Sequence, residues 1–272
     1  MLESRSFQRV AVLGCAGRMG KALLHAIYAE KDLKLAAAIE RPESPTIGSD
    51  VGALTGVGGL NVKVTDALAE VISGVDVVID FTRPDVTLEN LIYCLAAKKA
   101  MVVGTTGFQP EQIDIIHQAS KQIPIVMSPN MSIGISLCLM LIELATKTLG
   151  DSVDIEIIEA HHRHKVDAPS GTALQMGHVI AKAMGYDLND IAVNSRDGNV
   201  GARPRHAIGF SSVRAGDIIG DHTVMFAGNG ERIEITHRAS DRNNFALGAL
   251  RAARWLKNQS PGFYNLKDVL EG

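Results

Sequence analysis

The chain has 272 residues, of which 46% are hydrophobic and 21% are charged, a composition typical of a globular protein with one large or two modest domains. A net charge of -3 excludes an overall field that attracts nucleic acid or an anionic membrane, so we expect neither as a partner and look for a local cationic cluster instead. The three cysteines match no zinc or redox spacing, and the apolar stretch 133–142 is about half as long as a membrane span, so we predict a cytoplasmic protein.

Short apolar strands alternate with amphipathic helices in the first half of the chain. A strand at 9–14 is followed by a glycine turn and by a helix in which Leu23, Leu24 and Ile27 recur at helical spacing. Further strands are predicted at 33–40, 62–66, 76–81, 100–106 and 124–130, and helices beginning near Ala67, Pro84 and Pro110. The Gly/Pro-rich stretch 41–59 is predicted to be a mobile loop. This alternation predicts the doubly wound α/β class, a Rossmann-like parallel sheet with helices on both faces.

The pattern changes from about residue 151. Strands are predicted at 153–160, 206–213, 222–228 and 231–239, and one helix at 172–184. They predict a second, α+β domain with an open mixed or antiparallel sheet, whose half-apolar face would pack against another copy of the chain. The final helix, 243–256, is expected to return to the first domain. We therefore predict one domain at 1–131 and 241–272 and another at 132–240.

A glycine turn, Gly14-Cys-Ala-Gly-Arg-Met-Gly20, lies between the first strand and the first helix. Backbone N–H groups and the helix dipole at such a turn bind a dinucleotide pyrophosphate, although Ala16 replaces the second glycine of the commoner GxGxxG pattern. A tight turn that only packs the helix on the strand is the alternative. Glu40, at the end of the second strand, is placed to accept hydrogen bonds from a ribose, and Arg41 could pair with a 2′-phosphate. We therefore expect both NADH and NADPH as cofactors of a dinucleotide-binding first domain.

Two further loops follow strands of the predicted sheet, GTTG at 104–107 and SPNM at 128–131. Ligands of open α/β sheets bind at the carboxyl ends of the strands, where both loops lie. Their threonine hydroxyls and asparagine amide suit a nicotinamide ribose and carboxamide. Ordinary turn chemistry is the alternative for each loop taken alone.

The stretch EAHHRHKVDAPSGTA at 159–173 begins with an unbroken cationic run. A metal site is not expected, because Arg163 and Lys165 would repel the ion and no carboxylate or cysteine stands at ligand spacing. A solvated loop is a stronger alternative. However, Ser170 is suited to cap the helix that follows, so N–H groups at the helix start and the cationic run would meet at one small anion. A dicarboxylate would use both.

Four stretches together resemble one enzyme family. GCAGRMG, IDFTRP at 79–84, VVGTTGF at 102–108 and, most specifically, the histidine motif at 159–173 resemble 4-hydroxy-tetrahydrodipicolinate reductase, also called dihydrodipicolinate reductase, over nearly the whole chain. The resemblance implies a homotetramer, assembled through the second domain, that uses NADH or NADPH to reduce a cyclic imine dicarboxylate in diaminopimelate and lysine biosynthesis. Hydride would be delivered to ring C4 after loss of the 4-hydroxyl as water.

The same resemblance implies roles for individual residues. His161 would donate or accept a proton and Lys165 would donate one. The substrate carboxylates would be held by His162, Gly171 and Thr172. The cofactor-binding positions carried over by motif are Gly14, Cys15, Ala16, Gly17, Arg18, Met19, Glu40, Arg41, Gly104, Thr105, Thr106, Ser128, Pro129, Asn130 and Met131.

The chemistry of the residues agrees with this interpretation. Hydride addition to a conjugated imine leaves an enamine that needs a proton, and we expect neighbouring cations to lower the pKa of Lys165 toward a useful range. His161 could orient Lys165 or relay protons. Two alternatives stay open: another two-domain NAD(P)-dependent reductase, such as a semialdehyde dehydrogenase with a nucleophilic cysteine, or an NAD(P)-sensing regulator without turnover.

Overall fold

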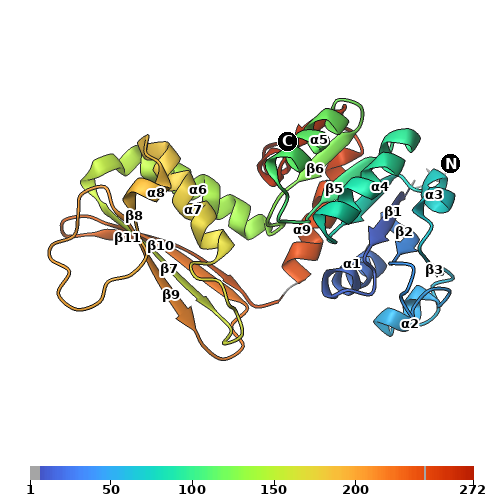
Figure 1. Cartoon of the computed structure of the whole chain (residues 1–272), viewed down its shortest axis with the longest axis horizontal. Helices are drawn as coiled ribbons and strands as arrows, with labels where there is room; N and C mark the ends of the chain where they lie inside the picture. The colour runs from blue at the N-terminus through green and yellow to red at the C-terminus, as the bar shows by residue number, and fades with distance from the viewer. Residues whose placement is uncertain (1–6, 242) are drawn as a thin grey trace. The chain divides into compact units, whose positions relative to one another are not determined.

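The computed structural model describes residues 7–241 and 243–272. They form two compact units: the residues up to Ile133 together with those from Asn243 onward, and Gly134–Asp241. These bounds differ by one or two residues from the predicted domain boundaries. Figure 1 shows the elements of both units.

The first unit is built on a seven-stranded sheet. All its strands pair in parallel, in the order β12-β6-β5-β4-β1-β2-β3. Their bounds are β1 (Gln8–Leu13), β2 (Leu33–Ile39), β3 (Val64–Thr65), β4 (Val77–Asp80), β5 (Ala100–Val103), β6 (Pro124–Met127) and β12 (Gly262–Tyr264). The order reverses between β1 and β4, and the carboxyl ends of strands at such a point form a ligand-binding crevice. The predicted doubly wound α/β class is confirmed.

Helices cover both faces of this sheet. Val10 and Val12 of β1 lie in one core with α1 (Arg18–Ala29), α9 (Asn243–Leu256) and α10 (Leu266–Glu271). Ala11 and Leu13 lie in the other core, which holds α3 (Leu68–Val71), the 3-10 turn η1 (Ile72–Gly74), α4 (Pro84–Ala97) and α5 (Pro110–Ser120). Because successive side chains of a strand point to opposite faces, strands covered on both sides are apolar throughout, as the sequence pattern required.

The stretch 41–59 is not structureless, so the predicted loop is wrong in part. It contains α2 (Val51–Thr55), capped by Asp50, whose carboxylate accepts hydrogen bonds from the backbone of Gly52 at 2.8 Å and of Leu60 at 2.9 Å. The helix ends at Gly56 in the left-handed conformation (φ 71°). The sequence features that could have predicted this helix are an aspartate suited to cap it, a short apolar run and a glycine after that run.

The second unit is a five-stranded sheet with helices on one face. The strands, in the order β11-β10-β7-β9-β8, are β7 (Asp154–His161), β8 (Ala192–Val193), β9 (Ile208–Arg214), β10 (Gly220–Ala227) and β11 (Arg232–Ala239). The pairs β7–β9 and β8–β9 are parallel and the others antiparallel, so the predicted open mixed sheet is confirmed. The helices are α6 (Ile133–Leu149), the 3-10 turn η2 (Gly150–Ser152), α7 (Gly171–Met184) and α8 (Leu188–Ile191), which was not predicted.

Helix α6 together with η2 is long and apolar enough to span a membrane, by length and composition alone. Its residues Ile135, Cys138 and Ile142 are nevertheless buried in the core of the second unit, against the strands and α7. The core helix of a soluble protein meets the same criterion, so this helix is weak evidence for a membrane segment.

Candidate active site

The glycine turn lies at the carboxyl end of β1, beside the point where the strand order reverses. Gly14 has a φ of +64°, which favours glycine, and its carbonyl accepts a hydrogen bond from Gly17 at 2.9 Å. Gly17 caps α1 without a side-chain hydrogen bond, and no acidic residue lies in the first turn of the helix. The positive end of α1 therefore fits an anionic pyrophosphate.

Gly20 makes this turn possible, because a Cβ there would lie 2.2 Å from the carbonyl oxygen of Gly14 and 2.6 Å from the Cα of Cys15. We expect Gly20→Ala to destabilise the first unit by about 3 kcal/mol, since the strand and helix would have to separate. Urea unfolding measures the loss. Gly74→Ala is the control, because a Cβ at Gly74 meets no atom within 4 Å. Equal stability of the two variants would contradict the close packing.

Glu40 already contacts the turn. Its carboxylate accepts hydrogen bonds from the backbone N–H of Ala16 at 3.0 Å and of Arg41 at 3.1 Å. The Arg41 side chain is exposed. The thiol of Cys15 is buried, and burial, with the charge of Glu40, raises its pKa to about 12, so only its backbone faces the turn.

The loop after β5 joins a buried network that the sequence did not indicate. Thr105 is buried, and its hydroxyl lies 3.3 Å from Asp80 Oδ1 and accepts hydrogen bonds from Thr82 N at 3.0 Å and Thr87 Oγ1 at 3.1 Å. The Thr105 hydroxyl thus faces the protein, whereas Thr106 is exposed. Burial raises the pKa of the Asp80 carboxyl despite hydrogen bonds from Thr82. The network holds the loops after β4 and β5 together.

The loop after β6 is likewise partly internal. The Ser128 hydroxyl donates to the carbonyl of Asn130 at 2.8 Å, and Asn130 Oδ1 accepts a hydrogen bond from Ser132 N at 2.8 Å. Met131 is 1% exposed and packs in the core, whereas Pro129 is exposed. Of the predicted cofactor-binding residues, Cys15, Thr105, Ser128 and Met131 therefore turn their side chains inward.

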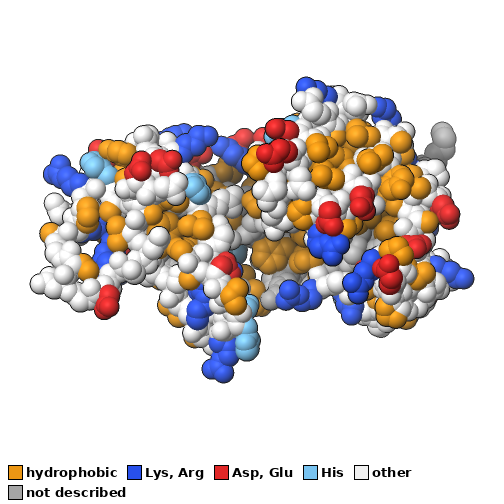
Figure 2. All heavy atoms as spheres, viewed as in Figure 1, with side chains coloured by type: hydrophobic (Ala, Val, Ile, Leu, Met, Phe, Trp, Pro, Cys, Tyr) orange, Lys and Arg blue, Asp and Glu red, His pale blue; other side chains and the backbone are white. Residues whose placement is uncertain are grey.

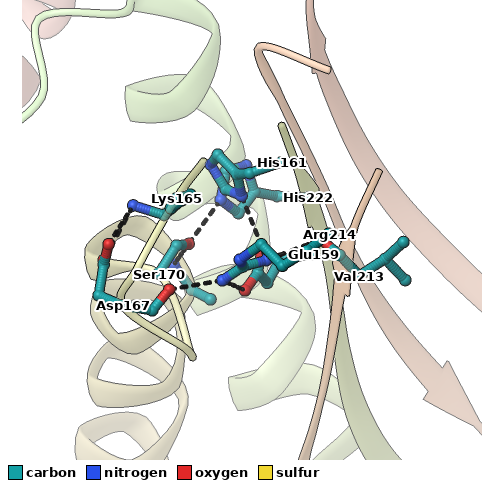
Figure 3. Close-up of polar contacts among 9 residues, drawn as sticks. Glu159, His161, Lys165, Asp167, Ser170, Val213, Arg214 and His222 are labelled. Atoms are coloured by element: carbon teal, nitrogen blue, oxygen red, sulfur yellow. Dashed lines mark hydrogen bonds and ion pairs between the residues drawn. The ribbon is translucent and has the colours of Figure 1, made fainter. Parts of the chain in front are cut away.

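In the second unit, the buried face of β7 changes from apolar to polar along the strand. Ile155 and Ile157 point into the core, and the next two inward positions are Glu159 and His161. On the neighbouring strands, His222 of β10 pairs with Glu159, and Arg214 of β9 pairs with His161. Polar groups from three strands are therefore collected at the end of the sheet where α7 begins (Figure 3).

Glu159 is the centre of this cluster and is 1% exposed. Arg214 donates to both carboxylate oxygens, at 2.7 and 2.9 Å, and His161 Nδ1 lies 2.5 Å from Oε2. Burial alone would raise the pKa of Glu159, but the hydrogen bonds from Arg214, Ser212 and His161 outweigh it and lower the pKa to about 2. Glu159 is therefore ionised at neutral pH.

The loop after β7 carries the rest of the cationic run. Lys165 Nζ donates to both carboxylate oxygens of Asp167 at 2.8 Å, so a carboxylate accompanies the cations expected around this lysine. This lysine lowers the pKa of Asp167. Arg163 and His164 are exposed. In Figure 2, basic and histidine side chains lie together at the lower end of this unit. Among the described residues, no three His, Cys, Asp or Glu side chains are grouped as metal ligands.

Helix α7 starts beside this cluster, and Ser170 caps it as the sequence predicted. The Ser170 hydroxyl oxygen accepts a hydrogen bond from Ala173 N at 3.2 Å and lies 3.0 Å from His222 Nε2. Burial, with the nearby charge of His161, lowers the pKa of His222 to about 4, so this ring is neutral at neutral pH.

The tautomer of His222 follows from its surroundings. His222 Nδ1 is buried without a hydrogen-bond partner among the described residues. A buried N–H without an acceptor is rarer than an unused acceptor, so the ring proton belongs on Nε2 and is donated to Ser170. Gly171 and Thr172, predicted to bind substrate, form the first turn of α7 beside it.

The predicted cofactor-binding residues thus belong to the first unit, and the predicted catalytic and substrate-binding residues to the second. The sequence did not single out Asp80, Arg214 or His222. Each is a polar residue at an inward position near a strand end.

A Rossmann-like sheet with a glycine turn, and a second domain with a cluster of histidine, lysine, arginine and carboxylate side chains, are features of a nicotinamide-dependent oxidoreductase. Comparison with protein families identifies which one. Residues 8–131 match the N-terminal model of dihydrodipicolinate reductase and residues 134–270 match its C-terminal model. The chain belongs to the dihydrodipicolinate reductase family, and it is an NAD(P)H-dependent reductase of diaminopimelate and lysine biosynthesis.

Solved structures agree with this assignment. A dihydrodipicolinate reductase from Paenisporosarcina sp. TG-14, solved with dipicolinate bound, is 26% identical, with a TM-score of 0.78 over 96% of this chain and 99% of that one. An amine dehydrogenase from Mycobacterium smegmatis (17% identity, TM-score 0.61, 96% of each chain) shares the fold. So does a probable dehydrogenase from Thermotoga maritima (15% identity, TM-score 0.64, 96% of this chain and 92% of that one).

Proposed function

We propose that the cluster at the end of β7 binds a cyclic imine dicarboxylate, dihydrodipicolinate formed from 4-hydroxy-tetrahydrodipicolinate by loss of water, and protonates it during reduction to tetrahydrodipicolinate. The observation that carries this proposal is the convergence of His161, Lys165 and the start of α7 on one end of the sheet. The dipicolinate in the related structure, a ring dicarboxylate, supports the same class of ligand.

The residues divide the work by their chemistry. The first turn of α7, with Gly171 and Thr172, and the imidazole of His162 hold the two substrate carboxylates, with the Ser170 hydroxyl as a further donor. When bound, NADH or NADPH supplies a hydride, which we place at ring C4. Lys165 then gives a proton to the enamine, and His161 relays or accepts one.

The cofactor is held by the first unit. The uncapped start of α1 and the tight packing at Gly20 fit a pyrophosphate, and Glu40 suits the ribose hydroxyls. In the loops after β5 and β6, the exposed Thr106 and the half-buried Gly104 and Asn130 would face the nicotinamide end. Use of both NADH and NADPH is part of this proposal.

The preference between the two cofactors is expected to depend on Arg41. Its side chain is exposed next to Glu40, where a 2′-phosphate would lie. We expect Arg41→Ala to weaken NADPH binding by about 1.5–3 kcal/mol, the scale of a charged hydrogen bond, and to leave NADH binding nearly unchanged. Calorimetric titration with each cofactor measures the difference. Equal losses for both would contradict a phosphate contact.

We further propose a cytoplasmic homotetramer that assembles through the second unit. The face of its sheet opposite α6 and α7 exposes Ile158 and Val213, at 36% and 45%. Such a face is suited to pack against a second copy of the sheet. Sedimentation equilibrium tests the number of copies.

The competing enzyme class is disfavoured by the cysteines. A semialdehyde dehydrogenase needs a reactive thiolate, but Cys15, Cys94 and Cys138 are all buried, and burial raises the pKa of each thiol, that of Cys94 to about 12. An activity assay distinguishes the reductase from an NAD(P)-sensing regulator without turnover. We expect rapid oxidation of NADH and NADPH when substrate is generated freshly from pyruvate and aspartate semialdehyde by the preceding synthase. Tight cofactor binding without oxidation would favour the regulator.

A further inference from the structure

The cluster at the end of β7 contains more than the residues that contact substrate in the proposed function. Glu159 is the most buried of its charged groups, and it can touch no ligand because Arg214 and His161 occupy both of its oxygens. A buried carboxylate is costly to keep unless it orients another group or is paired. Here it is paired with Arg214 and also contacts the one imidazole to which the proposed function gives a proton-transfer role.

The contact defines the chemical state of the His161 ring. Glu159 is ionised, so it can only accept, and the atom 2.5 Å away is Nδ1 of His161. Nδ1 must therefore carry a proton, and in the neutral ring Nε2 has the free lone pair.

Space is left on the Nε2 side by a glycine. A Cβ at Gly220 would lie 3.1 Å from Nε2 of His161, which is tight contact, and an ordinary 3.5 Å from Cδ2. No positive φ requires glycine at this position. Glycine at position 220 therefore leaves room for the His161 imidazole and is not required by the backbone conformation.

Arg214 links this arrangement to the substrate loop. Besides Glu159, it donates to the carbonyl of Asp167 at 2.6 Å, and Asp167 holds Lys165 through its carboxylate. One guanidinium therefore fixes both the carboxylate behind His161 and the loop that carries Lys165 (Figure 3).

We propose that Glu159 and Arg214 are positioning residues that hold His161 with its proton on Nδ1, so that Nε2, beside Gly220, is the nitrogen that exchanges protons in the reaction. The proposal rests on the proposed function for the role of His161. The other charged or titratable groups around the ring are His222 on β10, with its T-shaped ring contact, and Lys165 in the loop. His237 of β11 pairs with His222, on the edge of β10 that faces away from β7.

The first test needs no substitution at the pair. Nitrogen-15 NMR of protein labelled at histidine, with His161→Gln to assign the signals, reports the tautomer of the neutral ring. We expect a protonated Nδ1 and an unprotonated Nε2 for His161. A proton on Nε2 would overturn the proposal. If the tautomer is as expected but the unmodified protein has no reductase turnover, the proposed function fails and the positioning of the ring does not.

The second test is Glu159→Gln, which keeps the size and an acceptor oxygen but removes the charge. We expect kcat to fall about 100-fold, at the low end for a positioned acid–base group, with KM changed less than about 3-fold.

The matched control is Glu156→Gln. Glu156 lies on the same strand and is paired with Arg196 and Arg203, and no hydrogen bond or ion pair joins it to a histidine of the described chain. We expect its kcat and KM to match those of the unmodified protein. If both variants lose kcat equally, the effect is structural and the positioning role is wrong.

Gly220→Ala tests the Nε2 side and leaves the Glu159–Arg214 pair intact, so it remains informative if Glu159→Gln does not fold. We expect kcat to fall at least about 10-fold with the cofactor Kd unchanged. Gly228→Ala, just after the same strand, is the control, since a Cβ there meets its nearest atom at an ordinary 3.5 Å. An unchanged kcat in Gly220→Ala would show that Nε2 is not the exchanging nitrogen.

Discussion

We expect Lys165→Ala to lower kcat by about a thousandfold, within the range that a positioned proton donor contributes, while the Kd for NADH stays unchanged. The lysine belongs to the second unit, and its ammonium is held by two hydrogen bonds to Asp167. Its removal takes the proposed proton donor away but leaves the glycine turn and Glu40 intact. Steady-state NADH oxidation gives kcat, and fluorescence titration gives the cofactor Kd.

Lys182→Ala is the control for this result. Lys182 is an exposed lysine in the last turn of α7, whereas Lys165 lies near the first. We expect it to leave both kcat and the Kd unchanged. A loss of cofactor affinity in Lys165→Ala, without a loss of kcat, would move this lysine from proton transfer to cofactor binding.

The first unit could be predicted from sequence because its signals are local. Each buried strand is an apolar run, each helix has its own spacing, and a parallel sheet follows from their alternation. The two elements missed at the end of the chain are β12, which has three residues, and α10, which has six. Segments this short are stabilised by packing, β12 against β6 and α10 against α9. They contain too few residues for a helix or strand periodicity to be recognised in the sequence.

Local sequence patterns predict only part of the cluster at the end of β7. His161 and Lys165 stand in one motif, but Arg214 and His222 are brought to them only by the register of β9 and β10 on β7. That register depends on contacts between residues more than 50 positions apart. The burial of Glu159 could be predicted from the alternation of the strand. Ile155, Ile157, Glu159 and His161 lie on one face, so Glu159 and His161 are buried together with the two isoleucines.

The sequence also did not predict which side chains of the cofactor-binding loops face the interior. The motifs identified the loops after β5 and β6, but Thr105 and Met131 face the interior. Which residue of a short loop turns inward is decided by partners such as Asp80, which lies 25 positions before Thr105. A motif thus locates the loop, and the fold decides which of its atoms can reach a ligand.

The second large effect is expected from Arg214→Ala, which should destabilise the protein by about 3–5 kcal/mol at neutral pH, because it leaves the buried Glu159 charge without its main partner. Hydrogen bonding lowers the pKa of Glu159 from an ordinary value of 4.5 to about 2, which corresponds to about 3 kcal/mol of stability. Urea unfolding at fixed protein concentration measures the loss.

Arg196→Ala provides the comparison. The Arg196 and Glu156 side chains are 34% and 23% exposed, and Glu156 keeps a second partner in Arg203. A partly solvated pair of this kind contributes at most about 1 kcal/mol. Equal losses in the two variants would contradict the burial of the Glu159 charge as the cause.

The pH dependence makes the cause identifiable. Because the folded pKa of Glu159 lies below its unfolded value, its contribution in the unmodified protein is complete above pH 4.5 and is lost as the pH falls toward 2. In Arg214→Ala the carboxyl stays buried, so its folded pKa rises above the unfolded value and proton binding stabilises the folded state. The stability difference between the two proteins should therefore be largest near pH 7 and shrink as the pH falls toward 4. A difference that stays constant over this range would mean that Arg214 stabilises the sheet by packing and not through the charge of Glu159.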